Sequence, residues 1–139
     1  MSRLRFLAVL ETASNKPPLS QAPNPARTLN VRASEDTDLL IELVDDGFSP
    51  VQHAAGQAMT LTVRPTPSVE DERVFHLSGV PAPLEGPNLW RFTFSAGETR
   101  RRSTDFQRGF YAVLFTEASG SKSLVIPASP FHLINSVSR

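Results

Sequence analysis

Short stretches in which every second residue is apolar recur along most of this 139-residue chain. In residues 58–64 the apolar positions are Met59, Leu61 and Val63. Because successive side chains of a β-strand point to opposite faces, this alternation predicts a strand with one buried face. The same pattern predicts strands over residues 3–11, 38–44, 73–79 and 89–95, and a continuous apolar run predicts one over 109–117.

Turn-forming residues separate these segments. Asp45, Asp46 and Gly47 predict a turn in which the glycine supplies a positive φ, and Ser119-Gly120 predicts a hairpin turn. Residues 123–126 and 131–137 predict a last strand broken by two prolines, which belongs at a sheet edge or a bulge. Only residues 103–108 suggest a short helical turn. About seven strands at such spacing predict an antiparallel β-sandwich.

The first 28 residues differ from the rest. Residues 3–11 predict a strand with Leu4, Phe6, Ala8 and Leu10 on one face, but residues 12–28 contain four prolines and no aromatic residue. Such a segment cannot form a ladder, and in an extended form it could span about 50 Å at roughly 3.1 Å per residue. We therefore divide the chain into a docking arm, residues 1–28, and a sandwich, residues 29–139. The sequence leaves open whether the first strand pairs within its own domain.

Residues 109–117 are apolar on both faces of the predicted strand. Tyr111, Val113 and Phe115 lie on one face, and Phe110, Ala112 and Leu114 lie on the other. A strand of this kind is central in its sheet or is covered by a second subunit.

Composition and spacing indicate no enzyme. The chain has no cysteine, so a disulfide scaffold, a thiolate zinc site and a cysteine nucleophile are excluded. His53, His76 and His132 have no metal-ligand spacing, and no G-x-S-x-G motif is present. The acidic residues lack a calcium-loop spacing and are interpreted as turn residues and strand flanks: Glu35, Asp36, Asp38, Glu42, Asp45 and Asp46. We expect no catalytic residues, no metal and no cofactor.

Three adjacent arginines, Arg100, Arg101 and Arg102, follow Gly97. Arginines can clamp phosphates, but the formal net charge of the chain is zero and no aromatic residues alternate with them for base stacking. We therefore expect a solvated turn or a salt-bridging interface and no contact with nucleic acid.

Membrane insertion and export by a leader are not expected. The apolar run after Arg5 is interrupted at Glu11, below the roughly 7 residues of a signal-peptide core. No apolar run approaches the roughly 20 residues of a membrane span.

The order of features over residues 32–137 resembles the small Ig-like domain at the N-terminus of upper baseplate proteins of tailed bacteriophages, and related short virion proteins. Residues 35–47 contain a charged segment and then a strand that ends in an Asp-Gly turn, as in that family. Residues 49–63 contain a connecting segment with a proline near its start and a glycine and an alanine near its end, followed by a second strand. The later strand, the Ser/Thr/Asp segment and the strand headed by Gly109 match at 92–95, 103–106 and 109–115. The closing strands and their proline break match at 123–127 and 131–134. The fibre-like C-terminal extension of that family is not found before Arg139.

The resemblance implies an all-β fold, an Ig-like antiparallel β-sandwich of about seven strands with an extended N-terminal arm. It also implies a non-enzymatic structural component of a virion assembled in the host cytoplasm: a baseplate, neck or fibre-attachment adaptor, or a capsid decoration. The expected partners are other virion proteins and further copies of the chain in a symmetric assembly. The residues predicted to form interfaces are Leu4, Phe6, Leu10, Phe110, Leu114, Arg100, Arg101 and Arg102.

An alternative function stays open at this stage. Trp90, Phe92 and Phe94 share one face of a predicted strand, where a sandwich core is the simplest interpretation. A carbohydrate- or host-surface-binding module would instead use Trp90 or Tyr111 with loop residues.

Overall fold

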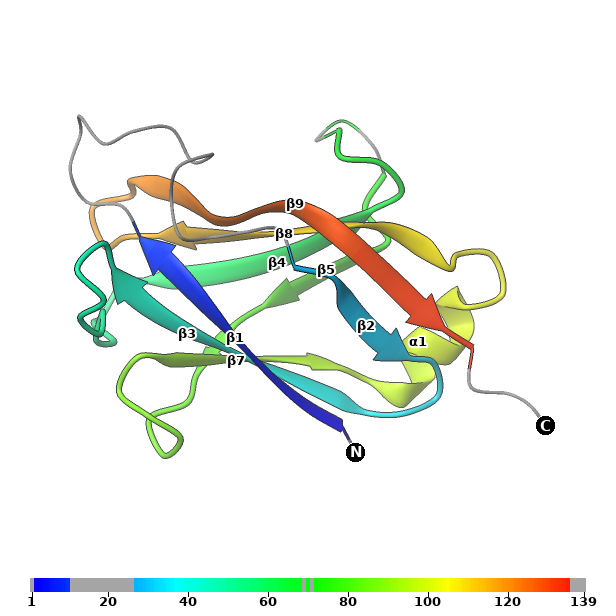
Figure 1. Ribbon diagram of the computed structural model, residues 1–139, viewed down its shortest axis with the longest axis horizontal. Coiled ribbons are helices and arrows are strands. Elements are labelled where there is room, and N and C mark those ends of the chain that lie inside the picture. Colours follow the sequence, from blue (N-terminus) through cyan, green and yellow to red (C-terminus); the bar gives the residue numbers. More distant parts are fainter. Residues whose placement is uncertain (1, 11–26, 69, 71, 136–139) are drawn as a thin grey trace.

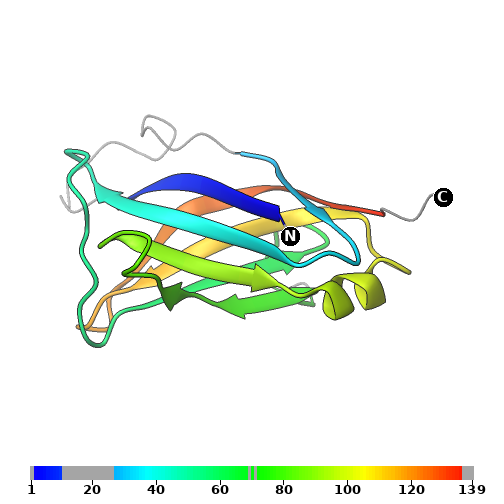
Figure 2. The ribbon, with the colours of Figure 1, turned by 90° about the horizontal axis from the view of Figure 1, so that it is seen from below.

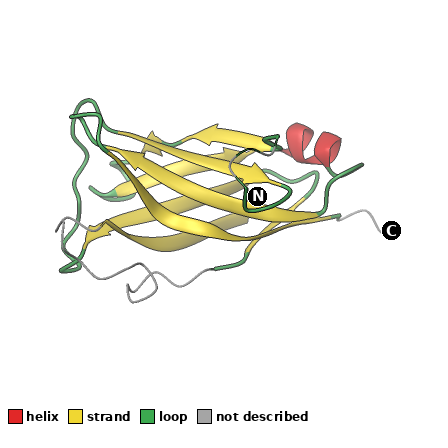
Figure 3. Cartoon of the chain, turned by 90° about the horizontal axis from the view of Figure 1, so that it is seen from above, coloured by secondary structure: helices red, strands yellow, loops and turns green. Residues whose placement is uncertain are grey.

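The chain forms two packed β-sheets with one short helix at an end (Figures 1 and 3). This computed structural model describes residues 2–10, 27–68, 70 and 72–135. The predicted tether, residues 12–28, lies outside the described residues except for its last two positions. None of the helical segments in the described part has the length and apolar character needed to cross a membrane.

The first sheet has four strands. Their order across the sheet is β1 (Ser2–Leu10), β3 (Thr37–Asp45), β7 (Leu89–Phe94) and β6 (Val80–Pro81). The second sheet has five strands in the order β2 (Leu29–Arg32), β9 (Lys122–Ile134), β8 (Arg108–Thr116), β4 (Ala58–Arg64) and β5 (Phe75–Ser78). This confirms the predicted all-β sandwich. In an Ig-like domain, strands in the order of β3, β7 and β6 face strands in the order of β9, β8 and β4, and this chain has the same arrangement. The strand β5 is an additional strand next to β4 in the second sheet.

The core lies between the sheets because the alternating apolar residues of both sheets point inward. β4 places Met59, Leu61 and Val63 in the core, each at most 1% exposed. At one end of the core, Phe131 packs against three phenyl rings at centroid distances of 5.8–6.1 Å, those of Phe75, Phe94 and Phe106.

The two earliest strands pair in parallel, in contrast to the antiparallel sheet expected throughout. β1 is parallel to β3 and β2 is parallel to β9, whereas the other pairs are antiparallel. Strands joined by tight turns must pair antiparallel, but β1 and β2 are connected to their neighbours by longer segments and are free of that constraint. Figure 2 shows β1 beside β3 along its length.

The helix lies before the helical turn predicted at residues 103–108, of which residues 103–105 form a turn and residue 108 belongs to β8. The helix is α1 (Ala96–Arg102), and Ser103 is its C-cap. Ser95 is the N-cap, and its hydroxyl accepts a hydrogen bond from the backbone N–H of Glu98 at 3.3 Å. The S-x-x-E spacing favours a helix start here, because the serine side chain accepts a hydrogen bond from a free backbone N–H of the first turn. The arginines favour the helix end here, because their positive charge offsets the negative end of the helix dipole.

The turn after β3 also differs from the prediction. Phe48, with φ 64°, is the left-handed residue, and Gly47 is not. The Asp45 carboxylate accepts hydrogen bonds from the backbone N–H groups of Gly47 and Ser49, both at 2.9 Å, so it closes the turn without a left-handed glycine. The Ser119-Gly120 hairpin is confirmed, with Gly120 at φ 93°.

The proline-broken last strand is one continuous strand, β9, with an irregular register against β8. The register shifts between Tyr111 and Leu114, which confirms the bulge predicted from the prolines. β2 pairs only with the far end of β9, from Phe131 to Ile134, so the proline-containing part of β9 lies at an edge.

Candidate assembly surfaces

The N-terminal strand is paired in cis and completes the first sheet at its edge. Phe6 and Leu10 are buried in the core at 7% and 5% exposure, and Leu4 packs against the core partly buried. Nine consecutive residues of β1 are in register with β3, from Ser2 opposite Thr37 to Leu10 opposite Asp45. Three of the predicted interface residues therefore lie against this chain's own β3, and no exposed face presents Phe6 or Leu10.

Charged residues fix β1 from its outer side. The Arg5 guanidinium forms an ion pair with Glu42 of β3 at 2.9 Å, and the Arg3 guanidinium forms one with Glu85 at 2.9 Å. Glu85 belongs to the turn between β6 and β7. Arginines that alternate with buried apolar residues thus match acidic residues on the neighbouring elements, which favours one register of β1 over a slipped one.

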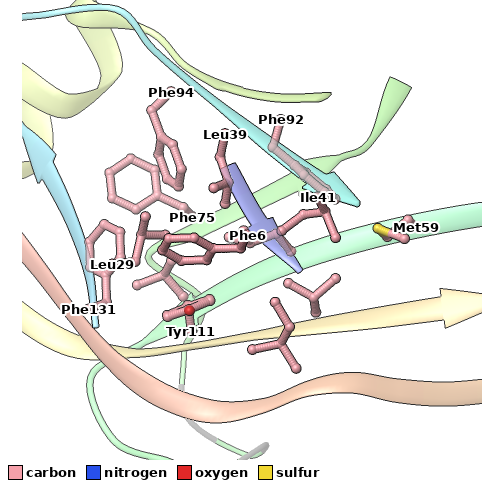
Figure 4. Packing of buried hydrophobic residues seen from close by; sticks show 14 of the residues in the cluster. Phe6, Leu29, Leu39, Ile41, Met59, Phe75, Phe92, Phe94, Tyr111 and Phe131 are labelled. Atoms are coloured by element: carbon pink, nitrogen blue, oxygen red, sulfur yellow. The ribbon is translucent and has the colours of Figure 1, made fainter. Parts of the chain in front are cut away.

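Phe6 joins β1 to the aromatic residues of the second sheet (Figure 4). Its ring lies 6.5 Å from the Tyr111 ring of β8. The guanidinium carbon of Arg27 lies 4.6 Å from the centroid of the Phe6 ring, a cation–π geometry. The Tyr111 hydroxyl donates to the Arg27 carbonyl at 2.8 Å, so the residues that enter β2 also enclose Phe6.

The burial of Tyr111 has a consequence for pH dependence. Desolvation raises the pKa of Tyr111 above its ordinary value of 10. In the unfolded chain the Tyr111 phenol ionises at about pH 10. The stability that the neutral, buried phenol contributes is therefore complete below that pH and falls as the pH rises above it. Tyr111 is the single tyrosine of the chain, so tyrosinate absorbance should appear together with loss of β-sheet circular dichroism. Tyrosinate forming in the folded protein near pH 10 would contradict this expectation.

A half-buried apolar stripe follows the outer face of the second sheet. The strand β8 is central, between β9 and β4, and buries Tyr111, Val113 and Phe115 on its inner face. Its outer residues are half-buried: Phe110, Ala112 and Leu114. Across the β8–β9 pair, Phe110 is opposite Pro130, and Leu114 is opposite Leu124, which is 43% exposed. We call Phe110, Leu114, Leu124 and Pro130 the outer stripe.

The three arginines occupy the last turn of α1, not an open turn. Arg101 and Arg102 are ion-paired with Glu98 at 2.6 and 3.5 Å, and the hydrogen bond from Arg101 lowers the pKa of Glu98. The Arg100 side chain donates to the Ser34 hydroxyl at 3.2 Å. All three side chains thus have partners in this chain, where they neutralise the helix end and connect it to the turn before β3.

The histidines and carboxylates are dispersed. His53 contacts the Leu89 carbonyl at 2.7 Å, and His76 contacts the Thr62 hydroxyl at 2.9 Å. Asp36 accepts from the backbone N–H of Ala96 at 2.7 Å, and Asp38 accepts from the Thr93 hydroxyl at 2.8 Å. Within the described residues, no group of three or more His, Asp or Glu side chains is arranged to hold a metal ion.

The aromatic residues considered for sugar binding are buried. Trp90 is 2% exposed and packs edge-on against His53 and Phe115, and Tyr111 is 1% exposed. Neither ring presents a face on which a sugar could stack.

Sequence reasoning did not identify Arg27, Glu42 and Glu85 as partners of β1. The alternation of Arg3 and Arg5 with apolar residues was a usable signal, because charges on the outer face of an edge strand select the neighbouring strand. The acidic partners could not be chosen from sequence, since Glu85 becomes adjacent to β1 only through the sheet order.

The comparisons with known proteins include a solved structure with a similar fold. No protein-family model matches the sequence, and a search of curated proteins finds no match. Among solved structures, the chain is similar to the N-terminal domain of phage TP901-1 ORF48, with 13% identity and a TM-score of 0.45. The alignment covers 95% of this chain and 98% of that chain. At this identity and TM-score the likeness supports no statement about family, binding or assembly.

Proposed function

We propose that this protein is a non-enzymatic structural component of a tailed-phage virion, assembled in the host cytoplasm through its sandwich and its N-terminal arm. Its place is at the baseplate, the neck or a fibre-attachment point, or on the capsid as a decoration. Its partners are other virion proteins, with several copies in a symmetric arrangement. The virion assignment is based on the order of sequence features that resembles baseplate N-terminal domains.

The observation that supports an assembly role best is the way β1 joins the sandwich. It is an edge strand held by one ladder, and residues 11–28 separate it from β2. A strand that is supplied on a tether and completes a sheet is the same device by which proteins add a strand to a neighbour's sheet. Division of the chain into an arm (1–28) and a sandwich (29–139) is part of this proposal.

The outer stripe is the second surface that supports it. The partly exposed apolar side chains of the outer stripe can bury further area only against another protein surface. Phe110 and Leu114 are therefore proposed to contact a neighbouring virion protein. The arginines of α1 lie at one end of the sandwich (Figure 3) and are proposed to form the charged rim of an interface.

The decisive experiment is to purify particles from lysates of the producing cells and measure the copy number of this protein by quantitative mass spectrometry. A fixed number of copies per particle is expected. A low multiple of three would indicate the neck or baseplate, and hundreds of copies would indicate a capsid decoration. Absence from washed particles would contradict the virion role.

Replacing Leu114 by aspartate should reduce incorporation into particles by at least about tenfold, equivalent to roughly 1.4 kcal/mol of binding free energy. The charge would lie in the centre of the outer stripe without entering the core, so the urea midpoint should change little. Leu84→Asp makes the same change at a leucine that is fully exposed, at 102%, and should leave incorporation unaltered. Equal incorporation of the two variants would remove the outer stripe from the proposal.

A further inference from the structure

We propose that β1 is exchanged between two copies of this chain, so that β1 of each copy lies on β3 of the other. The inference deepens the assembly role proposed above and identifies the partner of the arm as a second copy. We call the surface that receives β1 the β1 seat. It consists of the edge of β3 that pairs with β1, the acidic side chains Glu42 and Glu85, and the Tyr111 ring next to Phe6.

The β1 seat is complementary to the sequence of this chain's own β1. Phe6, Ala8 and Leu10 are buried at 7%, 0% and 5% exposure, and both arginines of β1 find acidic partners at 2.9 Å. Every copy carries an identical strand and an identical seat. A strand from a second copy would therefore make the same contacts, and mutual exchange gives a closed twofold arrangement.

The connection after β1 is longer than cis pairing requires. Arg27 lies against Phe6 and is held by the Tyr111 hydroxyl, so the chain that leaves Leu10 only has to return to the level of Phe6. That return is about 13 Å along a strand. Residues 11–26 include four prolines and could reach about 50 Å at roughly 3.1 Å per residue. The same connection can therefore reach the β1 seat of an adjacent copy.

Concentration decides between the two arrangements, because their strand contacts are the same. A tethered strand experiences its own seat at an effective concentration of about millimolar. Free copies at micromolar concentration should consequently hold β1 in cis. Where copies are crowded to millimolar local concentration, as in a particle, exchange competes.

A pair of cysteine substitutions can trap the exchanged form. Leu7 is opposite Glu42 in the register, on the outer face of β1 and β3, and Leu7 is 39% exposed. Adjacent strands lie at a separation of about 4.8 Å, which a disulfide can bridge. The chain has no cysteine of its own, so every disulfide formed involves the introduced thiols.

In the experiment, a Leu7→Cys chain and a Glu42→Cys chain are mixed and unfolded together in urea. The mixture is then refolded at about micromolar or about millimolar concentration and oxidised. Exchange predicts a disulfide-linked heterodimer of the two variant chains on non-reducing gels, at least about tenfold more abundant at the higher concentration. The matched control mixes Asp38→Cys with Thr93→Cys. These positions are opposite each other on β3 and β7, which are not tethered strands, and should give only background dimer.

The double variant Leu7→Cys with Glu42→Cys tests the geometry at micromolar concentration, where an intrachain disulfide is expected. A mixed-chain disulfide at millimolar concentration that is no more abundant than in the control at positions 38 and 93 would overturn the exchange. Failure of the intrachain disulfide in the double variant would also overturn it, because β1 would then not lie on β3. The result is independent of the particle measurement. A protein that is present in particles but gives only background mixed-chain disulfide at millimolar concentration would refute the exchange alone.

Discussion

Replacing Phe6 by alanine is expected to lower the free energy of unfolding by about 3–5 kcal/mol. The phenyl ring is 7% exposed and is enclosed by Tyr111 from β8 and by the Arg27 guanidinium. Its removal would leave a cavity between the sheets and withdraw the cation–π contact. Urea unfolding followed by circular dichroism measures the change.

Leu7→Ala is the matched control for Phe6. It lies on the same strand, one residue away, on the outer face, and is 39% exposed. A surface change of this kind usually alters stability by less than about 0.5 kcal/mol. If the two variants lost equal stability, β1 would not be docked through its inner face, and the account of the first sheet would be wrong.

Replacing Gly109 by alanine is expected to destabilise the domain by about 3 kcal/mol, although most glycine-to-alanine changes in a strand are favourable. A Cβ at this position would lie 2.3 Å from the Arg64 carbonyl oxygen and 2.7 Å from the Phe106 ring. The carbonyl belongs to the backbone of β4, the strand paired with β8, so it cannot move aside without loss of ladder bonds. Thermal or urea unfolding of the variant gives the measurement.

Gly97→Ala is the control for the general effect of replacing a glycine by alanine. Gly97 lies in α1, and no heavy atom lies within 4 Å of a Cβ added there. Alanine should stabilise this helix by about 0.5 kcal/mol. Destabilisation by both substitutions would indicate that glycine flexibility, and not the close approach of β4 and Phe106, is what the strand requires.

Much of the sandwich follows from local pattern. The β4 strand has the predicted bounds, and β3, β7 and β8 agree within a residue at either end. The alternation in β3, β4 and β7 and the apolar run in β8 each extend over six residues or more, so these strands can be recognised from the sequence. The strands β2 and β6 were not predicted, because four residues and two residues give too short an alternation to distinguish from a loop.

Pairing direction could not be predicted for the first strands. Alternation specifies which side of β1 is buried but carries no information on its neighbour, and the sequence between β1 and β2 has no hairpin signal. The helix was missed for a different reason. Ser95 and Glu98 give a capping signal, but Gly97 and the arginines resemble a turn, and seven residues provide little periodicity.

For the candidate surfaces, the inner and outer faces of β8 were predicted from alternation, and the core face agrees with the structure. The sequence did not predict the partners of the three arginines of α1. Ser34 and Glu98 lie beside them only because of the position of α1. The interface roles of the predicted residues remain proposals.

The parallel ladder between β1 and β3 also constrains the order of events during synthesis. Each residue of β1 meets a partner 35 positions later in the chain, as Ser2 meets Thr37. The Tyr111 ring, which closes over Phe6, is made later still. On the ribosome, β1 therefore has no surface to cover it until most of the domain has been translated. Until β3 and β8 have been made, the β1 seat of the same copy is incomplete, and β1 has no intrachain surface on which to pair.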